Sequence, residues 1–582
     1  MPPMASRAAF GATMAAACLV LGAVPAAAQS VPGALPSREQ VEAPRPAPRA
    51  PDGEVTVRDD TPRASPCPFT GSALEVSIGR LRYVQADGSA LPPEALAALA
   101  GVAPAPGPQK LTHLCDLRDQ AADALGRAGF VAAVTIPPQQ IDAGEVRLAV
   151  ILARLVDVQV SGSPGRHRRT IEARIAAMKA LPALNTRDLE RILMGANDVP
   201  GLQVMLALRP AGGPGEVIGM LSVSTTPFLL AASVQNSGSR TLGRESGMLR
   251  AEYYGLTGNA DRTFIGVSST SQLREQQVIQ AGHYFADEQG VTFGGRFSYA
   301  WSRPDLGGLD LRSRSMIAGV DVTAPLRRSV RAGADFGAGV EFIEQRVVLN
   351  FPGFGAIPVT QDKLRVGYLR LTMREREPRF GAPDKWGMGA SLELRKGFDL
   401  FGTTQTATIT PAGYAPSRFD GVATATVIRG SVDGFVSFGK LFSVATSSQA
   451  QWASDPLLSF EEFSVGSLTI GRGYDPGVTA GDKAIAVRTE PRLVIPLKSK
   501  RVAAQAFAFY DVVHIWNGDA FTTENDRSLR SWGCGIRAWL PGRLALEAAY
   551  AHPQDPELKL PGAPRAGDRV LLSLSVQFAP RR

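Results

Sequence analysis

Residues 463–477, FSVGSLTIGRGYDPG, contain a side chain that could bind an anion: Arg472, which lies between Gly471 and Gly473. The backbone N–H groups of a glycine-rich loop and a guanidinium can together hold a phosphate. The alternative is an ordinary hairpin turn whose arginine points into solvent. Strand-like residues before and after the glycines favour a hairpin.

A second glycine-rich stretch, GFVSFGKL at 434–441, resembles a nucleotide-binding loop. It has the glycines and Lys440 of such a loop, but Leu441 stands where a magnesium-binding Ser or Thr is needed. Strand-like segments flank it, so no helix N-terminus would face a phosphate. This stretch therefore predicts no nucleotide site.

Other catalytic patterns are missing from the sequence. The five histidines are far apart, and there is no H-E-x-x-H motif, no Cys/His cluster and no G-x-S-x-G elbow. We therefore predict that the protein is not an enzyme and has no catalytic residue, no metal site and no cofactor. A barrel enzyme that assembles a Ser/His pair across strands is the enzymatic alternative.

The first residues predict export from the cytoplasm. Arg7, an apolar stretch that ends at Val24 and the alanines at 26–28 form the three parts of a secretory signal over residues 1–28. A lipoprotein signal at Cys18 is the alternative. Without the signal the formal charge falls from +8 to +7, and the basic residues are scattered, so no nucleic-acid partner is expected.

Three cysteines remain after the signal. Cys67 and Cys115 lie at either side of one small domain and could form a disulfide, because an oxidising compartment permits one. Cys534 stands alone in a strand-like stretch. The alternative is two independent buried thiols. Upstream of Cys67, residues 29–64 are rich in proline, alanine and charge, which predicts an extended linker.

Residues 65–225 predict two small α/β modules in tandem, at 65–153 and 154–225. Each shows strand, helix and strand, and Gly129 is placed to end the first main helix. The apolar stripe of that helix consists of Leu117, Ala121 and Leu125. The apolar stripe of the main helix in the second module consists of Leu189, Ile192, Leu193 and Ala196.

Residues 226–582 predict a membrane barrel. Segments of about ten residues alternate with period two, and glycine-rich turns separate them. In the last segment Val570, Leu572, Leu574, Val576 and Phe578 would face lipid, while small polar residues would face a wet lumen. No other run is long enough for a membrane helix, so a membrane protein must be a closed barrel. The length predicts about sixteen antiparallel strands, and a soluble β-sandwich or propeller is the alternative.

Five motifs in this order resemble the outer-membrane transporters of two-partner secretion, the haemolysin and haemagglutinin secretion/activation proteins of the POTRA-plus-barrel superfamily. The resemblance covers nearly all of the chain after the signal. The motifs are SPCPF at 65–69, the stretches at 136–162 and 184–216, SDPLLSFEEFSVGSLTIGRGYDPG at 454–477, and FAFYDVV at 507–513.

The resemblance implies a fold of α+β POTRA modules in the periplasm followed by an all-β barrel in the outer membrane. It implies a monomeric pore that recognises a secreted β-helical exoprotein, of the filamentous haemagglutinin or haemolysin kind, through the POTRA domains. The exoprotein would pass unfolded to the cell surface without ATP, with or without activation. Outer-membrane lipids are the other expected contact.

The resemblance also assigns site residues. The tip of a hairpin folded into the lumen would be Arg472, Gly473 and Tyr474, and Asp511 on the barrel wall would pair with the arginine. Some members have a plug helix, which prolines in the linker would confine to about Val31–Ala43.

The alternative function is an outer-membrane β-barrel assembly and insertion factor. Such factors resemble this chain in the barrel motif but as a rule carry more POTRA modules. Two modules and the SDPLLSFEEF stretch at 454–463 therefore favour secretion.

Overall fold

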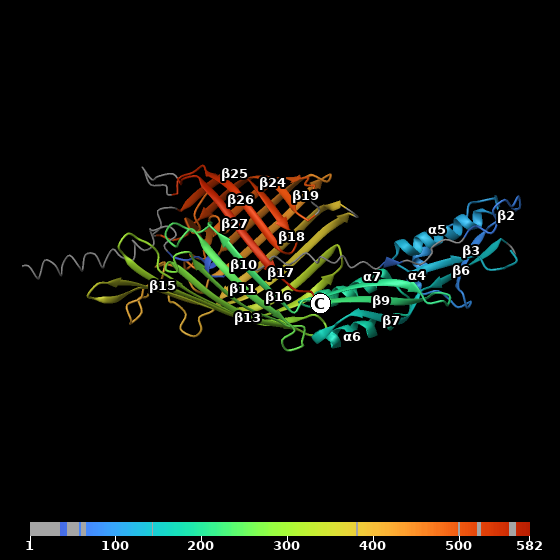
Figure 1. The fold of residues 1–582 in the computed structure, drawn as a ribbon, viewed down its shortest axis with the longest axis horizontal. Helices are drawn as coiled ribbons and strands as arrows, with labels where there is room; N and C mark the ends of the chain where they lie inside the picture. The colour runs from blue at the N-terminus through green and yellow to red at the C-terminus, as the bar shows by residue number, and fades with distance from the viewer. Residues whose placement is uncertain are drawn as a thin grey trace, which may run out of the picture.

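The structure of the protein is a computed structural model. It describes residues 35–42, 58–59, 66–141, 144–379, 382–498, 501–520, 525–557 and 566–581 of the 582-residue chain. The predicted signal peptide and most of the predicted linker lie outside the described residues. Figure 1 shows two small α/β modules in line, followed by a large barrel.

The first module is built around helix α5 (His113–Arg127), whose predicted stripe is buried: Leu117, Ala121 and Leu125 have no exposed surface. Gly129 follows the helix with φ of +95°, a conformation that favours glycine. A three-stranded sheet in the order β3-β6-β5 packs against α5, and β3 and β6 run parallel. The other elements are β2 (Glu75–Ser77), β3 (Arg80–Gln85), α4 (Pro93–Leu99), β4 (Pro108–Lys110), β5 (Ala132–Thr135) and β6 (Glu145–Leu152).

The second module repeats this arrangement. Helix α7 (Thr186–Asn197) is capped by Asn185, whose side chain accepts a hydrogen bond from the Arg187 N–H at 2.9 Å. The sheet order is β1-β8-β9-β7, and β1 (Arg58–Asp59) comes from the linker. The other elements are β7 (Arg154–Gly162), the 3₁₀ turn η1 (Gly165–His167), α6 (Arg168–Lys179), β8 (Leu202–Pro210) and β9 (Glu216–Thr225).

Within the described residues, sixteen antiparallel strands close into a barrel, because β27 pairs with β10. The predicted fold class is therefore confirmed. The strands are β10 (Phe228–Gln235), β11 (Ser246–Tyr254), β12 (Arg262–Thr270), β13 (Gln276–Ala286), β14 (Thr292–Ser302), β15 (Asp310–Arg328), β16 (Ala332–Phe351), β17 (Gly355–Arg379), β18 (Ala382–Gly397), β19 (Thr426–Phe438), β20 (Phe442–Ala453), β23 (Lys483–Ile495), β24 (Ala503–Trp516), β25 (Asp526–Leu540), β26 (Leu544–Pro553) and β27 (Arg569–Phe578).

The outer face of the barrel is apolar. In β27, Val570, Leu572, Val576 and Phe578 each expose between 43% and 62% of their surface, in the alternation that the sequence predicted. Since about half of the surface of each of these apolar side chains is left uncovered, this face suits a lipid environment. Among the described helices, none is long and apolar enough to cross a membrane.

The two ends of the barrel differ in their connections. Because β9 ends at Thr225 and β10 begins at Phe228, the start of β10 lies next to the second module, and we call this the module end. The turns at the module end are short, for example 439–441. The opposite end, which we call the far end, carries long connections, and these include 398–425, 454–482 and 517–525.

Candidate functional site

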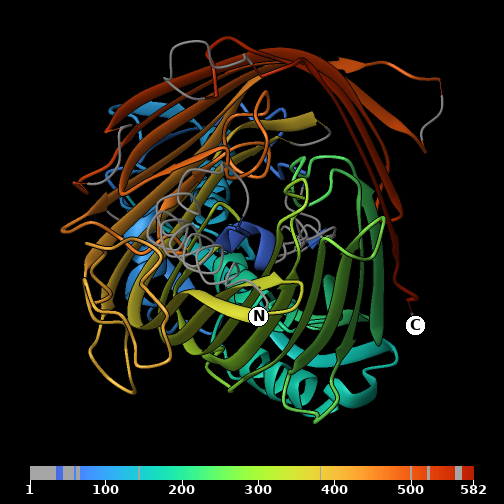
Figure 2. The ribbon, with the colours of Figure 1, turned by 90° about the vertical axis from the view of Figure 1, so that its left-hand side faces the viewer.

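Among the described residues, two segments of the chain itself occupy the lumen of the barrel. One is helix α3 (Arg38–Val41), which Figure 2 shows in blue at the centre of the ring of strands. The other is loop 454–482, in which β21 (Phe463–Val465) pairs with β22 (Thr479–Gly481). A barrel of sixteen strands is wide enough for an aqueous channel, so these two segments decide whether the pore is open.

The tip of loop 454–482 is buried against the wall. Val465 and Ile470 pack with residues of β24 and β25, including Val513 and Leu529. All of these side chains are at most 2% exposed. The predicted hairpin tip is therefore a packed part of the lumen and not a solvent-exposed turn.

The guanidinium of Arg472 contacts a different carboxylate from the one predicted. Its Nη1 lies 2.9 Å from Oε2 of Glu490 on β23, and its guanidinium carbon lies 4.7 Å from the centre of the Phe509 ring. Glu490 also binds Arg537 and Arg492. Arg472 thus joins an inward-facing cluster of charges on β23 and β25.

Asp511 does contact the tip, but through the backbone. Its Oδ2 accepts hydrogen bonds from the N–H groups of Gly471 at 3.0 Å and Arg472 at 2.8 Å. Its partner guanidinium is that of Arg488, which lies directly opposite on β23 and binds both carboxylate oxygens at 2.8 and 3.0 Å. The predicted side-chain pair between Arg472 and Asp511 is wrong, because the cross-strand arginine already fills the position in front of the carboxylate.

The other two predicted tip residues fix the turn. The hydroxyl of Tyr474 donates to the carbonyl of Arg530 at 2.8 Å, and the ring is 1% exposed. At Gly473 an added Cβ would lie 2.7 Å from the Cβ of Ser531, so only glycine fits there. Gly471 has φ of +121°, which a β-branched residue would rarely adopt.

Helix α3 is held by charges on the wall and on the loop. Arg38 binds both carboxylate oxygens of Glu341 on β16, at 2.8 and 2.9 Å, and Glu461 of loop 454–482 at 3.1 Å. The backbone is held as well, since the side chain of Gln280 donates to the carbonyl of Val41 at 3.1 Å. The short helix is therefore a plug attached at both ends.

Glu341 is the centre of this charge cluster. Besides Arg38, it contacts Arg296 of β14 and Arg395 of β18, and its side chain has no exposed surface. Arg395 also binds Glu461, at 2.8 and 3.0 Å. A buried carboxylate with three guanidinium partners neutralises part of the positive charge that the wall and the plug bring into the lumen.

A second charge cluster closes the far end. Arg418 of connection 398–425 binds Glu462 at 3.1 Å, Asp482 at 3.1 Å and Asp519 at 2.9 Å. Its guanidinium also donates to the carbonyl of Leu457 at 2.9 Å. One buried arginine thus ties together the connections 398–425, 454–482 and 517–525, and we call this group the mouth clamp.

Glu462 makes the mouth clamp sensitive to pH. Burial raises the pKa of Glu462 from 4.5 to about 7, and the neighbouring carboxylates of Asp482 and Asp519 act in the same direction, although Arg418 opposes them. The closed clamp therefore favours the protonated form. Its closure is most stable below pH 4.5 and weakens as the pH rises towards about 7.

We expect the current through the purified protein in planar lipid bilayers to increase as the pH is raised from 4.5 to about 7 and then to level off. The variant Glu462→Gln, which keeps the shape but cannot ionise, should lose most of this dependence. An equal pH dependence in both proteins would show that another group is responsible.

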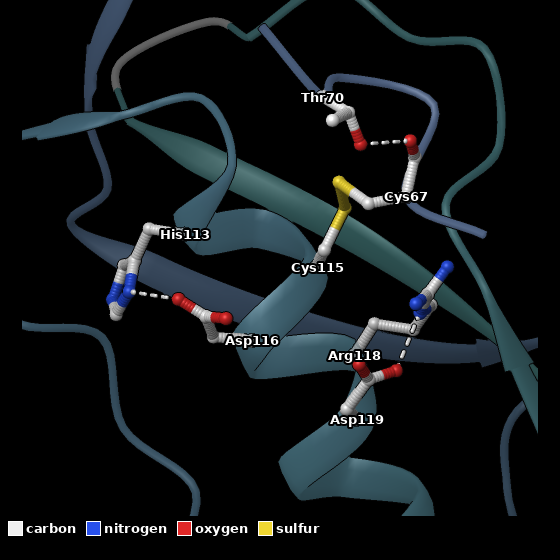
Figure 3. The surroundings of a disulfide bond; sticks show 7 residues. All are labelled: Cys67, Thr70, His113, Cys115, Asp116, Arg118 and Asp119. Carbon is white, nitrogen blue, oxygen red and sulfur yellow. Dashed lines mark hydrogen bonds and ion pairs between the residues drawn. A yellow bond between two sulfur atoms is a disulfide. The ribbon is translucent and has the colours of Figure 1, made fainter. Parts of the chain in front are cut away.

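The predicted cysteine pair lies in the first module, as Figure 3 shows. Cys67 and Cys115 form a disulfide with their Cα atoms 5.8 Å apart, while Cys534 is free and exposed. The disulfide attaches the segment that leaves the linker to the first turn of α5. Nearby, the Thr70 hydroxyl donates to the carbonyl of Cys67 at 2.8 Å and stabilises the turn.

Replacing both cysteines by serine should destabilise the first module by about 2–4 kcal/mol, because the disulfide removes conformational freedom from the unfolded chain. Limited proteolysis of the purified protein tests this loss of stability. In the double variant, cleavage between residues 66 and 152 should occur earlier, while the barrel stays intact. Cys534→Ser is the matched control. Unchanged cleavage in the double variant would contradict the expected stabilisation.

Sequence reasoning missed most of the charge clusters in the lumen. It did not identify Arg38, Glu341, Arg395 or Arg418, and it considered Glu461 and Glu462 only as part of a family motif. One signal was available: charged residues recur at every second position on the inward side of the strands, as in LELRKG of β18. That pattern places charges in the lumen but does not pair them.

Comparison with known proteins identifies the kind of molecule. Residues 380–538 match the family model described as haemolysin secretion/activation protein ShlB/FhaC/HecB. This chain is related to the two-partner secretion transporters. Among the curated members of this group, HuxB, the heme/hemopexin transporter protein of Haemophilus influenzae, is 21% identical over 458 residues, which are 76% of this chain and 78% of HuxB.

Further similarities agree with this relationship. The outer membrane transporter CdiB of Dickeya dadantii is 28% identical over 155 residues, 25% of this chain and 26% of that protein. The solved structure of CdiB from Escherichia coli has the same fold, with a TM-score of 0.66 at 15% identity over 99% of this chain and 100% of that one. The structure of CdiB from Acinetobacter baumannii gives a TM-score of 0.60 at 16% identity, over 87% of this chain and 90% of that one.

The predicted resemblance to two-partner secretion transporters is therefore confirmed. The family model and the relatives support an outer-membrane transporter with a transmembrane β-barrel that translocates a partner protein across the outer membrane. The matching family consists of transporters and not of enzymes.

Proposed function

We propose that the two modules lie in the periplasm, bind an unfolded exoprotein there and feed it through the barrel lumen to the cell surface without ATP. The module end of the barrel then faces the periplasm and the far end faces the outside. The connection lengths support this orientation, since outer-membrane barrels have short periplasmic turns and long external loops.

The observation that carries the proposal is that the pore is closed by segments that can leave without stranding charges. If α3 moves out with Arg38, Glu341 keeps Arg296 and Arg395, and Glu461 keeps Arg395. Ion pairs that can exchange partners lower the electrostatic cost of opening, because a buried charge without a partner is strongly destabilising.

The modules offer sheet edges for an extended exoprotein segment. At one of them, β8, the chain's own residues Arg58 and Asp59 pair in parallel with Ala207 and Leu208. This edge therefore accepts an added strand. Binding by strand addition relies on backbone hydrogen bonds and suits a partner that is still unfolded.

Transport without ATP agrees with the structure of the glycine-rich stretch at 434–441. Its first residues form the end of β19, and 439–441 form the turn to β20, so no helix N-terminus is present to hold a phosphate. Folding of the exoprotein outside the cell is then the energy source, because a folded β-structure cannot slide back through the lumen.

The proposed partner is a secreted β-helical exoprotein of the haemagglutinin or haemolysin type, which one monomer of the transporter exports with or without activation. Co-expression of such an exoprotein, carrying its own N-terminal secretion domain, tests the proposal. The intact chain should release it into the medium, and a chain lacking residues 65–225 should not, although its barrel still reaches the outer membrane.

Two outcomes would contradict secretion as the function. Equal release by the intact and the truncated chain would remove the role of the modules. Failure to secrete any exoprotein, together with defective insertion of other outer-membrane barrels in cells that lack this protein, would favour the assembly-factor alternative.

A further inference from the structure

Two neighbouring glutamates of loop 454–482 contact the two closures of the pore. Glu461 binds Arg38 of the plug helix α3 at 3.1 Å, and Glu462 binds Arg418 of the mouth clamp at 3.1 Å. The two carboxylates belong to adjacent residues, so their positions depend on one short piece of backbone. They are the link between the middle of the lumen and the far end.

The backbone at this link is held rigidly. Leu458 and Phe460, which precede the glutamates, are 1% and 2% exposed and belong to one apolar cluster with Val41 of α3. The N–H of Glu461 donates to the carbonyl of Leu458 at 2.9 Å. A tight turn packed in this way cannot move one glutamate while it leaves the other in place.

Each glutamate also belongs to a larger network. Glu461 is bound by Arg395 at 2.8 and 3.0 Å and by Arg429 at 3.1 Å, both on the barrel wall. Glu462 shares Arg418 with Asp482 and Asp519 at the far end. The link therefore joins two clusters that contain different elements of the barrel.

We propose that the plug helix and the mouth clamp open together, because the Glu461–Glu462 link transmits the release of one closure to the other. Departure of α3 removes Arg38 from Glu461 and Val41 from the apolar cluster that holds Leu458 and Phe460. The turn is then free to move, and its movement weakens the contact between Glu462 and Arg418. Displacement of α3 from the module end thereby unlocks the far end before any segment reaches it. The pore is then closed or open as a unit.

A double-mutant cycle on the pore itself tests the coupling and needs no exoprotein. The ratio of open to closed states is measured from single-channel currents in planar lipid bilayers for the unmodified protein, Arg38→Ala, Arg418→Ala and the double variant. Each single substitution removes charged hydrogen bonds and should raise the ratio by about tenfold. With coupling, the double variant should stay near the larger single effect.

Independent closures would give a different result. The two effects would then multiply to about a hundredfold in the double variant, and this outcome would overturn the proposal. Arg312→Ala is the matched control, because Arg312 is an exposed arginine on the far-end part of β15 that pairs with Asp310. It should leave the ratio unchanged.

Folding of each variant is checked separately, by the faster migration of an intact barrel on an unheated denaturing gel. If an alanine variant does not fold, the same cycle with Arg38→Lys and Arg418→Lys replaces it. Lysine keeps the charge but cannot bind two carboxylates with a planar guanidinium. Multiplying effects in that cycle would equally overturn the coupling.

Discussion

Replacing Asp511 by alanine is expected to release the tip of loop 454–482 and to destabilise the barrel by about 3–5 kcal/mol. The side chain of Asp511 is fully buried and binds both Arg488 and the backbone N–H groups of Gly471 and Arg472. Its loss leaves two N–H groups without their acceptor, and the Arg488 guanidinium keeps only the carbonyl of Thr469, at 3.2 Å, among its described partners. Urea unfolding of the purified protein in lipid vesicles measures the change in free energy.

Arg472→Ala is the informative comparison for this prediction. Glu490, the partner of Arg472, keeps Arg537 and Arg492, so no buried charge is left alone. The loss should be about 2 kcal/mol, from one charged hydrogen bond and the aromatic contact with Phe509. If Arg472→Ala costs as much as Asp511→Ala, the backbone contacts to Asp511 do not carry the stability of the tip.

Replacing Glu341 by alanine should open the pore. Without this carboxylate, Arg38 and Arg395 share Glu461, and Arg296 keeps Asp321, so the three guanidiniums repel one another more strongly. The expected cost to the closed state is about 2–3 kcal/mol, from the lost charged hydrogen bonds. Repulsion then drives out α3, because Arg38 is the one of these three arginines that does not lie on a strand of the barrel. Currents in planar bilayers should change from rare to sustained openings.

The matched variant Glu341→Gln separates charge from shape. Glutamine fills the same space and can accept hydrogen bonds from one or two of the arginines, but it does not neutralise them. It should open the pore less often than alanine and more often than glutamate. A pore that stays closed in both variants would show that α3 is held by its backbone contacts alone.

The fold could be predicted from the sequence, because the period of the apolar pattern and the length of each segment determine it. The alternation in β27 assigns an outer and an inner face without knowledge of any partner strand, and the stripe of Leu117, Ala121 and Leu125 assigns the buried face of α5. The strand number follows from chain length and the spacing of turns. None of these inferences depends on contacts between distant residues.

The site was accessible only in part. The family motif pointed to the right segments, the tip at Arg472 and the wall at Asp511, because both lie in recognisable stretches. The actual partners depend on register: Arg488 faces Asp511 because β23 and β24 pair in one particular alignment. A shift of two residues would have placed Glu490 there, and no local pattern fixes that choice.

The plug illustrates the same limit. The side chain of Gln40 accepts a hydrogen bond from the N–H of Ser37 at 2.8 Å, which is one half of a capping box, and the Ser-x-x-Gln spacing is visible in the sequence. Its position in the lumen depends on Glu341 and Glu461, which lie 303 and 423 residues further along the chain from Arg38. Such pairs cannot be derived from spacing.

The central claim is that the exoprotein passes through the lumen after α3 leaves it. The most direct measurement is secretion by a chain in which a short bifunctional thiol reagent joins Val41→Cys of α3 to Gln280→Cys of the wall, in a Cys534→Ala background. The Gln280 side chain reaches the carbonyl of Val41 at 3.1 Å, so a linker of about that side chain's length spans the gap. Each single cysteine variant serves as the control. We predict that the cross-linked chain retains the exoprotein in the periplasm while both single variants release it, and normal secretion by the cross-linked chain would contradict the claim.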